Sequence, residues 1–226
     1  MSYGCKIKNT DSEIQIDDTY INYNIVETHL SESISNAAGD VFTTVSFTTA
    51  TSLNPLILFR PTTDSDFAYI SIDSYIKSGS NFTGFKAITT KGFSNNEFDW
   101  KLALPSPSKS AETYGLRTYN SSGDLIFDSG LDYFKIYSVT TGIDIKTAEQ
   151  TVTHAGISNP YYILSPTYFA VDSPAGGIIW YRAGLKYNSS TSVKIREFQI
   201  KTGVYPPAEL KGGNRPDLTL LVCDVN

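Results

Sequence analysis

Apolar and polar residues alternate along most of this chain with the two-residue period of a β-strand. Residues 67–76, F-A-Y-I-S-I-D-S-Y-I, give a clear example. Turn residues separate such runs about every eight to twelve positions, a spacing typical of an all-β sandwich. Residues 28–40 are polar and are expected to form a loop. The strands predicted from the pattern are 20–26, 41–48, 54–61, 67–76, 84–90, 98–104, 116–119, 125–127, 133–139, 150–153, 159–166, 168–171, 177–183, 193–200 and 218–222.

The most regular stretch is residues 113–132, T-Y-G-L-R-T-Y-N-S-S-G-D-L-I-F-D-S-G-L-D, which predicts a β-hairpin. Its two strands are rich in aromatic and aliphatic residues, which suit a half-buried sheet. Between them lies the turn Asn120-Ser121-Ser122-Gly123, where Gly123 is free to take a positive φ. We therefore expect this hairpin to be the centre around which its half of the chain is organised.

A degraded copy of the hairpin opens the chain, so the sequence is internally repeated. Tyr3-Gly4 matches Tyr114-Gly115, an offset of 111 residues, and Asn9 matches Asn120 at the same offset. A second frame, Asn-Pro, five residues and Pro, occurs at Asn54–Pro61 and again at Asn159–Pro166. Small differences in offset are what loop insertions and deletions produce. The same arrangement of strands is therefore expected twice.

These patterns predict an all-β protein with two tandem, internally duplicated antiparallel β-sandwich domains. We place the N-terminal sandwich at residues 1–104, a proline-containing linker at 105–112 and the C-terminal sandwich at 113–201. A C-terminal extension, 202–226, carries one last strand, which we expect at a sheet edge.

Composition narrows the function classes. Charged residues are only 18% and aromatic residues 13%, with 15 Tyr and 12 Phe, as in a β protein with a hydroxyl-rich surface. The net charge of −5 and the lack of a basic stripe argue against nucleic-acid binding. No apolar run is long enough to span a bilayer, and no leader pattern follows the first residues, so we expect no membrane insertion and no signal peptide.

Candidate reactive residues are few. His29 and His154 are the only histidines and therefore the only candidate imidazole bases, but no nucleophile motif accompanies either one. The acidic pairs Asp17-Asp18, Asp64/Asp66 and Asp128/Asp132 contain ligand types for calcium, although turn capping explains them as well. We expect no enzyme activity, no metal and no other cofactor.

The two cysteines, Cys5 and Cys223, form no Cys-x-x-Cys pair, so a zinc site is not expected. They could pair if the terminal strands are neighbours, or both could be free buried thiols. The sequence leaves these two alternatives open.

Recognition through aromatic side chains is the remaining possibility, because Tyr and Trp offer large rigid faces with a polar tip to sugars or proteins. Strand alternation would also place about half of these side chains in a core, and Trp180 is expected there. The candidate binding residues are Tyr161, Tyr162, Tyr168, Tyr181 and Tyr187.

The segment Tyr114–Ser129 resembles a recurring stretch in small tail proteins of tailed bacteriophages, Y-G-(apolar)-x-(apolar)-x-N-x-x-G-x-(apolar)-x-F-D-S. Thr118 departs from the apolar preference, and the N-terminal copy departs further, with Cys5 for the aliphatic residue and Ser12-Glu13 for Gly-x. Both copies cover about a sixth of the chain, and the motif carries no catalytic residue.

The resemblance implies a non-enzymatic virion structural protein at the tail tip or tail fibre, made in the host cytoplasm and acting in docking and host attachment. The N-terminal half would be the docking side. Implied partners are other phage structural proteins and a host surface glycan or protein receptor, with a homo-oligomer expected in the particle. A carbohydrate-binding module and a capsid decoration protein remain as alternatives.

Overall fold

The computed structural model describes residues 6–8, 14–17, 22–34, 42–62, 69–90, 96–105, 109–145, 148–165, 168–172, 178–203 and 217–225. All regular structure in these residues is β, which confirms the predicted class. The strands are β1 (Lys6–Lys8), β2 (Ile14–Asp17), β3 (Asn24–Ile34), β4 (Phe42–Thr51), β5 (Leu56–Pro61), β6 (Ile70–Ser78), β7 (Asn81–Thr89), β8 (Asn96–Leu104), β9 (Arg117–Tyr119), β10 (Leu125–Asp128), β11 (Lys135–Ile143), β12 (Gln150–Thr153), β13 (Tyr161–Ser165), β14 (Tyr168–Asp172), β15 (Ile178–Ser189), β16 (Ser192–Gly203) and β17 (Leu218–Asp224).

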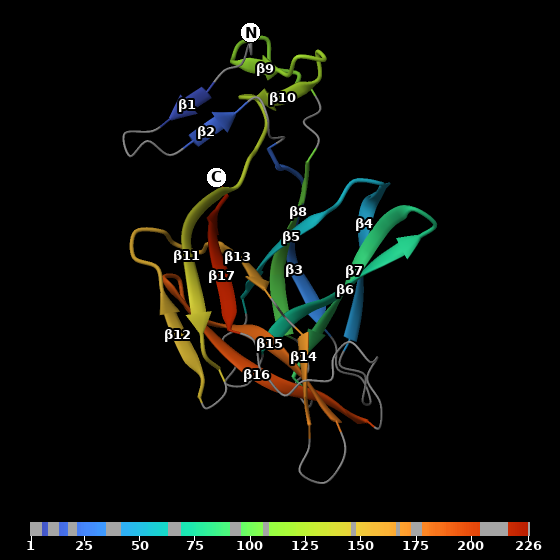
Figure 1. Cartoon of the computed structure of the whole chain (residues 1–226), viewed down its shortest axis with the longest axis vertical. Helices are drawn as coiled ribbons and strands as arrows, with labels where there is room; N and C mark the ends of the chain where they lie inside the picture. The colour runs from blue at the N-terminus through green and yellow to red at the C-terminus, as the bar shows by residue number, and fades with distance from the viewer. Residues whose placement is uncertain are drawn as a thin grey trace.

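Two antiparallel sheets pack face to face, so the chain is a β-sandwich (Figure 1). The first sheet has the strand order β11-β17-β13-β5-β8-β3. The second has the order β12-β16-β15-β6-β7-β4, with β14 added beside β15. Trp100 and Phe85, both fully buried, meet edge to face between the sheets with ring centroids 5.1 Å apart.

The predicted duplication is visible in the strand order. Strand β3 corresponds to β11, β4 to β12, β5 to β13, β6 to β15, β7 to β16 and β8 to β17. With these equivalences, the strand order of each sheet is the same when counted from either edge. The registers agree, since Leu56 pairs with Ala103 where the second half pairs Tyr161 with Cys223. Each half therefore supplies three equivalent strands to each sheet, about an approximate two-fold axis.

The two halves join edge to edge within both sheets. Tyr162 of β13 pairs with Phe59 of β5, and Leu185 of β15 pairs with Ile70 of β6. One buried apolar cluster contains all four of these residues and runs through both halves. The segment predicted as a linker, 105–112, connects two halves of a shared sandwich.

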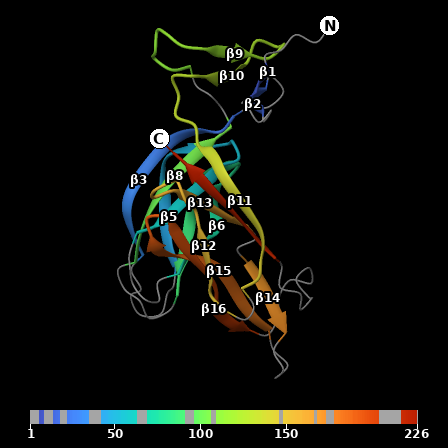
Figure 2. The ribbon, with the colours of Figure 1, turned by 90° about the vertical axis from the view of Figure 1, so that its left-hand side faces the viewer.

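Both hairpins, β1–β2 and β9–β10, lie at one end of the molecule, beyond the sandwich (Figures 1 and 2). The stems that follow them meet: Asn24 bridges Tyr133, and the Ile25 amide donates to the Asp132 carbonyl at 2.7 Å. Beneath the stems, Tyr23 and Phe134 pack against a second apolar cluster on the outer face of the first sheet. Equivalent stems from the two halves thus anchor the hairpin end.

Two sequence predictions differ from the structure. Residues expected to begin a loop at 28 instead continue β3 to Ile34, because an edge strand tolerates polar residues and irregular register. The last strand, β17, is not at an edge but lies between β11 and β13. Its inner residues Leu218, Leu220 and Val222 are fully buried, so the end of the chain completes the first sheet.

Candidate functional site: the projecting hairpin

The turn of the β9–β10 hairpin is closed by the side chain of Asn120. Its Oδ1 accepts hydrogen bonds from the amides of Ser122 (2.9 Å) and Asp124 (2.8 Å). The Gly123 amide donates to the Asn120 carbonyl at 3.0 Å, and Gly123 has a φ of 86°, as the sequence predicted. The Asn-x-x-Gly spacing therefore specifies this turn.

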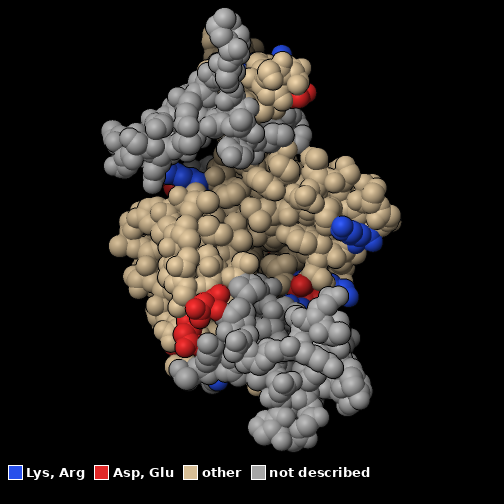
Figure 3. All heavy atoms as spheres, viewed as in Figure 1, with Lys and Arg blue, Asp and Glu red and all other residues tan. Residues whose placement is uncertain are grey.

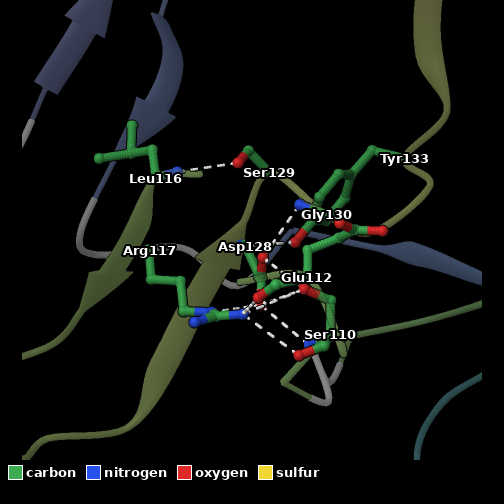
Figure 4. A network of polar contacts seen from close by, with 8 residues as sticks. All are labelled: Ser110, Glu112, Leu116, Arg117, Asp128, Ser129, Gly130 and Tyr133. Carbon is green, nitrogen blue, oxygen red and sulfur yellow. Dashed lines mark hydrogen bonds and ion pairs between the residues drawn. The ribbon is translucent and has the colours of Figure 1, made fainter. Parts of the chain in front are cut away.

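Asp128 is the centre of a polar network at the base of the hairpin (Figure 4). Its carboxylate, 1% exposed, accepts from Arg117 Nε at 2.7 Å and from the amides of Ser110 and Gly130 at 2.9 Å each. The hydrogen bond from Arg117 is the main cause that holds the Asp128 pKa well below its ordinary value, and the two amides add to it. The carboxylate is thus a structural anion.

Arg117 carries the network to the segment before the hairpin. Its Nη2 donates to the carbonyls of Ser110 (3.2 Å) and Glu112 (2.7 Å). On the other side, Tyr133 stacks on Phe127 with ring centroids 5.1 Å apart, and its hydroxyl accepts from the Asp128 amide at 3.0 Å. Contacts from both flanking segments therefore fix the hairpin to its stem.

Gly115 has a steric role. The hydroxyl of Ser129 accepts a hydrogen bond from the Leu116 amide at 2.8 Å, and this places Ser129 Oγ 2.4 Å from where a Cβ on residue 115 would lie. The backbone φ of Gly115 is 142°, which side chains rarely adopt. Only glycine fits at this position.

Tyr114 is different from the rest of the motif, because its side chain is 92% exposed. Leu116 (43%) and Tyr119 (50%) of the same hairpin are also exposed apolar residues. Gly115, Asn120, Gly123, Phe127, Asp128 and Ser129 all have intramolecular roles. The hairpin thus presents Tyr114 outward from a rigid base.

The N-terminal hairpin repeats this arrangement at the level of the backbone, with Ile7 opposite Ile16. The residues that carry its half of the repeat, Tyr3, Gly4, Cys5 and Asn9, lie outside the described part of the chain.

The expectation that Tyr161 and Tyr162 are surface residues is wrong, because they are 6% and 3% exposed. They belong to β13, a central strand of the first sheet that is covered on both faces. Tyr161 faces outward beneath the Arg60 guanidinium, whose carbon lies 5.0 Å from the ring centroid. Tyr162 faces the core and its hydroxyl is 2.7 Å from His154 Nε2. Neither offers an open ring to a ligand.

The other candidate tyrosines are dispersed. Tyr181 and Tyr187 are half-buried, and the side chain of Tyr168 lies outside the described residues. Tyr187 and Tyr162 line one small pocket with a volume of about 10 Å³, enough for a water molecule at most. The four tyrosines whose side chains the structure describes are buried or half-buried and form no common exposed surface.

The two histidines occupy unrelated environments. His154 is buried beside Tyr162, and burial lowers its pKa while raising that of Tyr162. His29 lies on the edge strand β3 and stacks flat on Trp100, with ring centroids 4.2 Å apart. Sequence reasoning gave no signal for this stacking, which depends on the pairing of β3 with β8.

Cys223 is a free, fully buried thiol whose pKa is raised to about 12 by burial, and Cys5 lies outside the described residues. Among the residues that the structure describes, no three His, Cys, Asp or Glu side chains gather as a metal site. No helix in the same residues is long and apolar enough to cross a membrane. On the face in Figure 3, the described charged residues occur in small separate groups.

The chain matches no protein-family model, and neither a curated protein nor a solved structure is significantly similar to it.

Proposed function

We propose that this chain is a non-enzymatic structural protein of a tailed bacteriophage virion, and that it attaches to the tail through its hairpin end. The observation that carries the proposal is Tyr114, which is 92% exposed near the exposed Leu116 (43%), in a segment whose glycine, Asn120, Phe127, Asp128 and Ser129 positions are occupied by internal contacts. A large aromatic side chain held on a rigid base is well suited to insert into a pocket of a partner protein.

The position of the hairpins supports docking through one end of the molecule. Both halves send a hairpin to that end, and the stems are tied together through Asn24 and Tyr133. We therefore assign docking to the hairpin end as a whole, rather than to the N-terminal half. The opposite end of the sandwich would then face away from the tail.

The test is complementation of a phage that lacks this gene, followed by quantification of the chain in purified particles. Tyr114→Ser and Leu116→Ser should each reduce incorporation about tenfold or more, since a central aromatic or aliphatic anchor is commonly worth over 1 kcal/mol. Leu30→Ser is the matched control, because Leu30 is 67% exposed on the edge strand β3 of the sandwich. It should incorporate like the wild type.

Absence of the chain from particles, or normal incorporation of both hairpin variants, would overturn the proposal. Cryo-EM of particles with a labelled chain separates the tail from the capsid. Label on the capsid would favour the decoration protein instead.

A further inference from the structure

A cleft lies between the edge strands β3 and β4, and none of the hairpin residues line it. Its volume is about 500 Å³, within the range of small-molecule sites, and it opens where the two sheets separate. Val26, Leu102 and Leu104 provide an apolar lining, and the hydroxyl-bearing residues Thr48 and Thr49 of β4 provide a polar one.

Glu27 holds the two sides of this cleft together. β4 departs from regular pairing with β7 between Ser46 and Thr51, and within this interval the Glu27 carboxylate accepts the amides of Thr48 (3.0 Å) and Thr49 (3.3 Å). His29 Nε2 also lies 3.2 Å from the Glu27 carboxylate. Two backbone amides and one imidazole nitrogen therefore surround this carboxylate. The cleft is therefore preformed.

His29 is fixed in orientation by two contacts. One is the contact with Glu27, and the other is the flat stack on Trp100, with an interplanar angle of 5°. Its side chain is 37% exposed and lines the cleft, and Nδ1 has no hydrogen-bond partner among the described residues. A ring nitrogen is thus available to a bound molecule.

We propose that this cleft binds a neutral, hydroxyl-rich ligand of the saccharide class. The threonine hydroxyls and the His29 nitrogen can pair with sugar hydroxyls, while Val26, Leu102 and Leu104 suit the C–H faces of a sugar ring. The Glu27 carboxylate disfavours an anionic ligand, and its oxygens are already engaged by protein donors, which leaves them poorly placed to hold a cation. This inference adds a ligand site that does not depend on the docking function.

The purified full-length chain is tested against methyl glycosides of neutral hexoses and N-acetylhexosamines, with sialyllactose as the anionic comparison. Saturation-transfer NMR reports binding without a virion, so its outcome is separate from that of the incorporation experiment. Fluorescence of Trp100, in a Trp180→Phe background, reports movement of the stacked His29 ring. A neutral glycoside should bind saturably and change this fluorescence.

Replacing both Thr48 and Thr49 by Val removes two hydroxyls while keeping side-chain volume, and should weaken binding at least about tenfold. Val26→Trp, at the mouth, should abolish binding by filling the cleft. Thr44→Val, an exposed position of β4 outside the cleft, should bind like the wild type. Unchanged melting temperatures identify the variants as folded.

Three results would overturn the proposal. They are the absence of binding by every neutral glycoside at millimolar concentration, binding by sialyllactose alone, and binding that survives both cleft variants.

Discussion

At the residue scale, the hairpin depends on the negative charge of Asp128 and on the lack of a side chain at Gly115. The buried Asp128 carboxylate accepts hydrogen bonds from an arginine and from two backbone amides, so its charge is compensated inside the molecule. Gly115 leaves the space that the Ser129 hydroxyl occupies. These two structural requirements explain why the motif contains Gly115 and Asp128 although neither has a reactive role. No intramolecular requirement explains Tyr114, so it is the motif residue that we expect to contact a partner.

Gly115→Ala should loosen the hairpin without unfolding the sandwich. The backbone strain at this φ costs about 1–3 kcal/mol for a residue with a Cβ. Moving Ser129 Oγ also removes its hydrogen bond with Leu116, worth about 1 kcal/mol. Hydrogen exchange of the Leu116 amide should accelerate about tenfold or more, with little change in melting temperature. Gly123→Ala, with open space around the added Cβ, should have a smaller effect. An equal effect at both positions would contradict the steric role of Gly115.

The Asp128 network should make the hairpin sensitive to acid. Because its pKa is lower in the folded protein than the ordinary 3.8, the stabilisation is fully present above that value. It declines as the pH falls below 3.8 and is lost once the pH passes the folded pKa. Amide NMR of Ser110 and Gly130 should therefore show the hairpin opening progressively as the pH is lowered below 3.8. Asp128→Asn should open the hairpin at all pH values, whereas Asp124→Asn, in the turn, should keep the wild-type titration.

At the element scale, the sequence predicts the last strand, β17, but does not predict its central position in the first sheet. Residues 218–222 were predicted as a strand correctly, from their apolar run, but their place between β11 and β13 depends on pairing across 50 or more residues of sequence. Periodicity gives the type of an element and not its neighbours.

Leu220→Ala tests the place of β17 in the core. The side chain of Leu220 packs on the inner face of the sheet and is fully buried. Its truncation to Ala should therefore lower the free energy of unfolding by about 2–5 kcal/mol. Leu30→Ala, at 67% exposure, should change it by less than about 0.5 kcal/mol. Urea denaturation followed by tryptophan fluorescence measures both. Similar effects of the two substitutions would show that β17 is dispensable.

Other elements show where prediction from sequence succeeds and fails. The hairpin at 116–127 and its turn were predicted closely, because Asn120 and Gly123 act locally. Tyr161 and Tyr162 were misjudged, since strand alternation says that neighbouring side chains face opposite ways and does not say that both faces are covered. The cleft beside Glu27 had no sequence signal, because β3 and β4 face each other only after the sheets form.

At the scale of the whole molecule, the repeat in the sequence predicted a duplicated sandwich but not how its copies meet. Each half contributes β5 and β6, or β13 and β15, as the strands nearest the approximate two-fold axis. Their pairing makes both sheets continuous and joins the cores. A sequence repeat is equally compatible with two copies that share a core and with two separate domains. Whether each half folds on its own is therefore a question for experiment.

Separate expression of residues 1–108 and 109–226 measures it directly. We expect neither half alone to be a cooperatively folding monomer, because separation exposes the inner edges of both sheets, including the buried residues Phe59 and Ile70. Each half should aggregate or pair with itself, since the approximate symmetry lets a second copy occupy the place of the missing half. Mixing the two should restore a one-to-one complex with a single melting transition, read by light scattering and calorimetry. A half that stays monomeric and melts cooperatively would instead be an autonomous domain, and the shared core would then contribute little to its stability.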